Sequence, residues 1–170
     1  MSEQEFLDEI GTKALRYDKY SGCSQSVLLS LQEGFNIGNK ESFKAATVLS
    51  GGIARRGETC GALIGALMAL GLVIGRDEIE KTEQYAKATN VAFKVCEEFK
   101  RELKEFGFNT ELETTLCREI QERILGRSFD LSDEVEMKAL LDSGGHSDDG
   151  CPKVCAIATK VVAKEILDRK

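Results

Sequence analysis

The sequence predicts an all-α protein, a single-domain multi-helix bundle that spans residues 1–170. Pro152 is the one proline in the chain, and this scarcity favours long helices over many short strands joined by turns. Apolar residues recur at helical spacing, and no pair of segments alternates as a strand pair would. The length suits one domain with a full core, and the 42% hydrophobic content excludes a disordered chain.

Two helices are expected before residue 35. Ser2 and Glu5 form the pattern of a capping box, which predicts a first helix that runs to about residue 17. The segment "SGC", residues 21–23, opens a second apolar run. This second helix is expected to end near Gly34, because glycine is the favoured residue just after a helix.

A third helix, a loop and a fourth helix should follow. Asn39 is a good cap for the third helix, which Gly51 and Gly52 would stop. The loop of residues 51–58 leads into a helix that starts near residue 59 or 60 and ends near residue 72. Residues 59–75 carry no charge, but they are few and rich in glycine for a membrane span, which favours a buried core helix.

The second half of the chain predicts four more helices. Asp77 should cap a long helix over residues 78–106, on which Ala92, Cys96, Phe99 and Leu103 form an apolar stripe. A helix over residues 116–125 should follow, and Ser132 should cap another over residues 133–141.

The last of these helices begins at the segment "CPKVC". Pro152 suits its first position, which would make Cys151 the residue that caps it. The only histidine, His146, lies in the polar loop before this helix, and a lone histidine excludes metal sites that need several.

The net charge and the N-terminal segment indicate which classes of partner and which cell compartment suit the chain. The chain holds 23 basic and 29 acidic residues, a formal net charge of −6, which argues against general nucleic-acid binding. The acidic N-terminus "MSEQEFLDEI" does not resemble a secretory signal, so a cytoplasmic protein without a membrane span is expected. In that compartment structural disulfides are rare, and cysteines serve packing, redox chemistry or metal binding.

Six cysteines divide into two groups by their place on the predicted helices. Cys96 and Cys155 lie in apolar stripes and are interpreted as packed core residues. The other four lie at or near helix starts; they are Cys23, Cys60, Cys117 and Cys151. The free N–H groups of a helix start favour a thiolate, and four thiolates would repel one another unless a cation joined them. However, no Cys-x-x-Cys pair is present, so common zinc and ferredoxin patterns are missing.

The segment "GGIARRGETCGALIG" resembles the signature of the redox-active proteins named for the pattern C_GCAxxG_C_C. The matching positions are Gly51, Gly52, Arg55, Gly57, Thr59, Cys60, Gly61, Ala62 and Gly65. Three other segments are similar to the outer cysteine elements of that family: "SGCSQSVLL", "LCREI" and "CPKVCAIA". The resemblance covers residues 17–166. The family is in turn similar to the C-terminal part of split-Soret cytochromes c, although no Cys-x-x-Cys-His motif for covalent haem occurs here.

The resemblance implies a redox protein whose four cysteines, Cys23, Cys60, Cys117 and Cys151, hold one iron–sulfur cluster of unknown type. The role would be electron transfer or redox sensing, with a redox protein as partner; whether the chain acts as an enzyme stays open, and a homodimer is allowed. Residues expected beside the cofactor are Gly51, Gly52, Arg55, Gly57, Thr59 and Gly61. Two alternatives remain: a metal-free thiol–disulfide protein, and structural zinc on the same cysteines.

We also expect specific roles for the glycines and arginines of this signature. Gly51, Gly52 and Gly57 would let the backbone take positive φ and approach a bound group. Arg55 and Arg56 could screen an anionic cluster or dock an acidic partner. Gly61, Gly65 and Gly71 would let neighbouring helices come close to the fourth helix.

Overall fold

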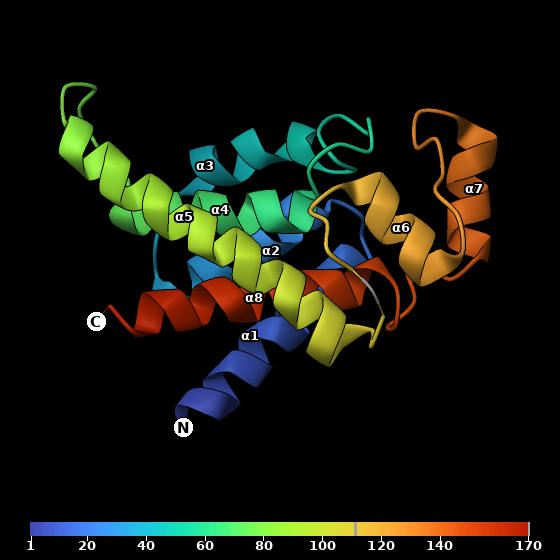
Figure 1. Cartoon of the computed structure of the whole chain (residues 1–170), viewed down its shortest axis with the longest axis horizontal. Helices are drawn as coiled ribbons and strands as arrows, with labels where there is room; N and C mark the ends of the chain where they lie inside the picture. The colour runs from blue at the N-terminus through green and yellow to red at the C-terminus, as the bar shows by residue number, and fades with distance from the viewer. Residues whose placement is uncertain (111, 170) are drawn as a thin grey trace.

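The computed structural model describes residues 1–110 and 112–169 and confirms the all-α prediction (Figure 1). Over these residues it contains helices and no strand. The α-helices are α1 (Glu3–Asp18), α2 (Cys23–Phe35), α3 (Lys40–Ala45), α4 (Gly61–Ile74), α5 (Thr82–Glu102), α6 (Cys117–Leu125), α7 (Glu134–Asp142) and α8 (Cys151–Leu167). A short 3₁₀ segment, η1 (Ala46–Leu49), follows α3, and a π-helical turn, η2 (Leu103–Gly107), follows α5.

The main core surrounds α8. Helices α1, α2, α4 and α5 all contact α8, and α2 also packs along α4 (Figure 1). The interior is filled by apolar side chains that are almost wholly inaccessible to water, among them Leu31, Leu63, Phe99 and Val162. Because each of these helices buries a stripe of this kind, hydrophobic burial is the main force that holds the bundle together.

Two glycines of α4 allow close contact with α2. A methyl group on Gly65 would collide with the carbonyl oxygen of Ser24, and one on Gly61 would collide with the Cys23 sulfur. Gly71 differs, because a methyl group there would meet only open space. The expected role in helix packing is therefore confirmed for Gly61 and Gly65 and wrong for Gly71.

A second, smaller core lies at the end of the molecule where α6 and α7 stand (Figure 1). Its buried members are Cys117, Phe129, Leu131 and Leu140, with Leu125, Met137 and Ala139 packed around them. Since Cys117 belongs to this cluster while Cys60 belongs to the main core, the predicted cofactor cysteines come from both.

Several predicted helix ends are confirmed. Ser2 and Glu5 form the reciprocal capping box, and Asn39 accepts a hydrogen bond from the backbone N–H of Ser42. The second helix ends at Phe35, near Gly34 as expected, but Gly34 is not the residue that follows it. Gly34 lies inside the helix, where a methyl group would lie 2.9 Å from Ile10 Cγ2.

Three predicted caps are wrong by one to a few residues. Asp77 pairs with Lys81 Nζ at 2.7 Å, and α5 begins only after Lys81. Asp133, not Ser132, caps α7, because its carboxylate accepts from two backbone N–H groups of the first turn. Cys151 is the first residue of α8 and Gly150 its cap, so Pro152 occupies the second position.

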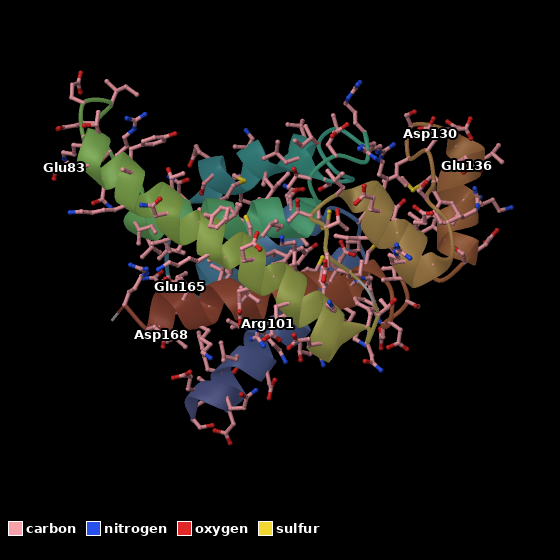
Figure 2. The ribbon with its side chains drawn as sticks, in the orientation of Figure 1. Glu83, Arg101, Asp130, Glu136, Glu165 and Asp168 are labelled. Carbon is pink, nitrogen blue, oxygen red and sulfur yellow. The ribbon has the colours of Figure 1, made fainter. Side chains whose placement is uncertain are left out.

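Charged side chains cover the outside of the bundle (Figure 2). Residues 77–83 are all exposed, as expected for a solvated acidic run. Arg101 of α5 pairs with Glu98 of the same helix and with Glu105 of η2, and Arg127 bridges to Glu136 of α7 at 2.8 Å. Such exposed pairs contribute little stability each. None of the described helices has the length and apolarity that a membrane crossing requires.

Candidate functional site: four helix starts around one cavity

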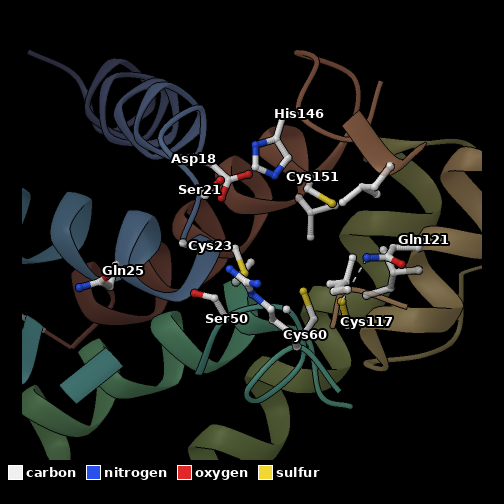
Figure 3. A pocket seen from close by; sticks show the side chains of 18 of the residues that line it. Asp18, Ser21, Cys23, Gln25, Ser50, Cys60, Cys117, Gln121, His146 and Cys151 are labelled. Atoms are coloured by element: carbon white, nitrogen blue, oxygen red, sulfur yellow. Dashed lines mark hydrogen bonds between the residues drawn. The ribbon is translucent and has the colours of Figure 1, made fainter. Parts of the chain in front are cut away.

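The four predicted cysteines meet at one cavity. Cys23, Cys117 and Cys151 are the first residues of α2, α6 and α8, and Cys60 directly precedes α4. All four line a cavity of about 470 Å³ (Figure 3). They are free thiols in the structure. The fold thus gathers residues that are as far as 128 positions apart in the sequence (151 − 23).

A short backbone pairing sets Cys60 beside Cys117. Thr59 and Leu116 form an isolated antiparallel bridge. The N–H of Cys60 donates to the Thr115 carbonyl at 2.7 Å, and the N–H of Cys117 donates to the Glu58 carbonyl at 2.7 Å. Both bonds are made by the backbone N–H groups of the cysteines themselves. The segment that leads into α4 and the segment that leads into α6 are therefore held side by side.

The loop before Cys60 is left-handed over five successive residues. Gly51 and Gly52 have φ of 66° and 68°, and Gly57 has φ of 70°, which confirms that these glycines take positive φ. Ile53, Ala54 and Arg55 do so too, at 60°, 51° and 64°. For residues with a Cβ this conformation costs about 1–2 kcal/mol each, and such strain is concentrated at functional sites.

Backbone hydrogen bonds hold this strained loop closed. Gly57 N–H donates to the Gly51 carbonyl at 3.0 Å, and Glu58 N–H donates to the Gly52 carbonyl at 2.9 Å. A methyl group on Gly52 would lie 2.6 Å from Glu58 N and 2.7 Å from Cys117 Cβ. One on Gly57 would lie 3.1 Å from Arg118 Cβ. The space beside both glycines is therefore filled by the chain itself.

The residues expected beside the cofactor fall into two sets. Gly51 and Arg55 line the cavity together with the cysteines. Gly52, Gly57, Thr59 and Gly61 are not among its lining residues; they shape the chain around it through the loop closure, the bridge and the contact with Cys23. Their direct role in cofactor binding stays a prediction, and the structure gives them a positioning role in addition.

Burial outweighs the helix-start effect on the thiols. We expected the helix N-termini to favour thiolates, and hydrogen bonds from the N–H groups of Ala62 and Leu63 do lower the pKa of Cys60. Burial acts in the opposite direction and is larger, so the pKa of Cys60 is raised. For Cys23, burial and the nearby Cys60 thiol raise the pKa to about 12. Without a bound cation these cysteines are therefore neutral thiols near pH 7.

The cysteines also act on one another. Burial raises the pKa of Cys117, and the charges of Cys60 and Cys23 raise it further. The pKa of Cys151 lies well above its ordinary value because of burial, then the charge of Asp18, then the other three thiols. Mutual repulsion of this kind is relieved by a positively charged group between the sulfurs.

Asp18 and His146 also border the cavity, and sequence reasoning had not singled out Asp18. Asp18 is only 1% exposed, its Oδ2 has no hydrogen-bond partner, and its carboxylate lies next to His146 (Figure 3). The sequence does contain a signal that Asp18 is buried: it continues, at helical spacing, the stripe of Leu7, Ile10 and Ala14 on α1.

The two remaining cysteines differ from each other. Cys155 is fully buried, as expected for a core residue, and its thiol also donates to the Cys23 carbonyl oxygen at 3.9 Å. Cys96 packs half-buried against the main core and does not line the cavity. Cys155 is thus a packed neighbour of the site, and Cys96 is separate from it.

The spacing of the possible metal-binding side chains can be compared with the needs of a single metal ion. Over the described residues, no three Cys, His, Asp or Glu side chains are grouped closely enough to hold one metal ion. Tetrahedral zinc needs sulfurs about 3.8 Å apart, because the edge of a tetrahedron is about 1.6 times the Zn–S bond of about 2.3 Å.

Fold and site together define an all-α protein in which four dispersed cysteines, each at a helix start, border one cavity. The family described as "Putative redox-active protein (C_GCAxxG_C_C)" matches residues 21–165. The chain belongs to this family. Comparison with curated proteins and with solved structures found no match.

Proposed function

We propose that the protein is a redox protein that holds one iron–sulfur cluster on Cys23, Cys60, Cys117 and Cys151, for electron transfer or redox sensing. The observation that carries this proposal is the shared cavity: four cysteines from distant parts of the sequence line it together. A cluster there would supply one-electron transfer. Four thiolates are the usual ligands of such clusters.

The burial of these cysteines supports a bound cation. Thiolates in this cavity are unfavourable without positive charge, because burial and their mutual repulsion raise the pKa of all four. The N–H groups at the helix starts can donate to sulfurs, which tunes a cluster's potential.

The alternatives have weaker support. Structural zinc would require the four sulfurs to close around one ion, for which the described residues show no grouping. A metal-free dithiol–disulfide protein would need a reactive thiolate, whereas these thiols have raised pKa values and are free.

Anaerobic purification with iron, acid-labile sulfide and zinc analysis tests the proposal. We expect coloured protein with iron and sulfide. Cys60→Ser should abolish and Cys117→Ser strongly weaken iron binding, whereas Cys96→Ala, away from the cavity, should retain it. Protein that holds neither iron nor sulfide after reconstitution, or that loses iron in Cys96→Ala but not in Cys117→Ser, would contradict the proposal.

A further inference from the structure

The cavity offers an apolar wall in addition to the cysteines. Leu131, Met137 and Leu140, from α7 and the segment before it, line it, and Val48 and Ile120 add further apolar surface. Its volume of about 470 Å³ lies within the range of about 300–1,000 Å³ typical of small-molecule pockets. Mostly apolar walls with a few polar groups are also the usual composition of such pockets.

One polar group in this cavity lacks a partner. Asp18 is 1% exposed and lines the cavity, and its Oδ2 is the one buried side-chain oxygen or nitrogen without a hydrogen bond in the described part of the chain. Leaving a buried polar atom unpaired costs about 1–3 kcal/mol, and more for a charged group. A bound molecule with a hydrogen-bond donor at this point would remove that cost.

A cationic donor would stabilise the carboxylate of Asp18 in its charged form. Burial has the largest effect on Asp18 and raises its pKa, whereas the nearby His146 lowers it. The other neighbours in the cavity are the cysteines, which become negative when they ionise and cannot supply a positive charge. Arg55 is the other basic residue at the cavity, on the strained loop. An amine is therefore better matched to the Asp18 end than a carboxylate.

We propose that the cavity binds a small organic amine beside the four cysteines, with its amino group on Asp18 Oδ2 and its apolar body against Leu131, Met137 and Leu140. The binding site is defined by these residues alone. Its meaning as a substrate site for redox chemistry rests on the proposed function, because a molecule there would lie next to the cluster.

The experiment uses anaerobically purified protein with methyl-¹³C methionine and benzylamine as the probe. The chain has three methionines, of which Met137 lines the cavity while Met68 packs against the main core. Benzylamine should shift the Met137 methyl resonance saturably and leave Met68 and Met1 unchanged. Benzoate, which has the same ring and an anionic group, should bind at least about tenfold more weakly.

A matched pair of variants assigns the effect to Asp18. Asp18→Asn keeps the shape but removes the charge and should weaken benzylamine binding by about tenfold or more, as for a charge-assisted hydrogen bond. Asp148→Asn removes an exposed carboxylate that pairs with Lys19 at 2.6 Å and should leave binding unchanged. If Asp18→Asn does not fold, the benzylamine–benzoate comparison on the unmodified chain decides alone.

Three results would overturn the proposal: no saturable shift at Met137, equal or tighter binding of benzoate, or undiminished binding by a folded Asp18→Asn. The iron content of the same samples is measured independently. Iron-containing protein that fails to bind benzylamine refutes the amine site while the proposed function stands. Iron-free protein that binds it refutes the proposed function and leaves the amine site in place.

Discussion

At the scale of single residues, the competition between burial and local hydrogen bonds decides the state of the thiols. At Cys23, hydrogen bonds from the Gly51 backbone and the Ser50 side chain lower the pKa, but burial and the neighbouring Cys60 raise it more. The hydrogen bonds that favour a thiolate at a helix start are thus outweighed by burial and by the neighbouring thiol. A stable thiolate at Cys23 therefore requires a bound cation.

The raised pKa of Cys23 predicts a specific pH dependence of stability. The folded, cofactor-free chain keeps this proton up to a pKa of about 12, whereas an unperturbed cysteine releases it near 9.0. Between these values the folded state binds more protons than the unfolded state, so the free energy of unfolding falls as pH rises. The contribution is complete below about pH 9 and is lost as pH passes about 12.

Urea midpoints of cofactor-free protein at pH 8, 9 and 10, roughly spanning the start of this window, measure the effect. The decrease should be smaller in Cys23→Ser, which removes one of the shifted groups, while ordinary lysine and tyrosine titration remains. Identical decreases in the unmodified chain and in Cys23→Ser would show that Cys23 does not contribute.

At the scale of elements, the left-handed loop of residues 51–55 positions the site by fitting against its neighbours. Gly52 lies against both Glu58 and Cys117. The loop, the Thr59–Leu116 bridge and the start of α6 are therefore packed directly against one another. At Gly52 and Gly57 the missing side chain makes room for neighbouring protein atoms, and the expected place of these glycines beside a cofactor stays a prediction.

Gly52→Ala is expected to destabilise the cofactor-free protein by about 2 kcal/mol or more, because positive φ and a backbone collision add together. Gly71→Ala is the matched control: it lies in α4, has open space beside it, and should stabilise by up to about 1 kcal/mol. Denaturant midpoints of both variants provide the measurement. A neutral Gly52→Ala would mean that the loop readily adopts another conformation.

At the scale of the whole molecule, the cysteines join two cores. Cys23 and Cys60 pack with the main core, Cys117 belongs to the small core of α6 and α7, and the cavity lies between residues of both. A cofactor bound by all four cysteines would therefore connect the α6–α7 end to the bundle.

Removal of the cofactor should loosen this end of the molecule selectively. Hydrogen–deuterium exchange should become faster in residues 51–60 and 116–145 of the iron-free protein, whereas α1 and the second half of α8, which pack in the main core, should keep their protection. Peptide-resolved mass spectrometry of the loaded and iron-free protein measures the difference. Uniform loss of protection along the chain would show that the cofactor stabilises the bundle as a whole.

Much of the fold could be predicted from local patterns. The capping box of Ser2 and Glu5 and the cap at Asn39 depend on neighbours a few residues away and were found where the sequence placed them. The helix start predicted at Asp77 was wrong, because Asp77 pairs with Lys81 and α5 begins only at Thr82. Gly34 lies close to the end of its helix as expected, but inside it and against Ile10.

The sequence by itself determined the all-α class, the helix-start position of Cys23, Cys60, Cys117 and Cys151, and the positive φ of the signature glycines, because these follow from short-range geometry and from a motif. Only the tertiary structure decided that the four cysteines share a cavity, that burial raises their pKa, and that Asp18 lies there with an unpaired oxygen. Those properties depend on which surfaces meet when distant helices pack, and no short-range pattern specifies that.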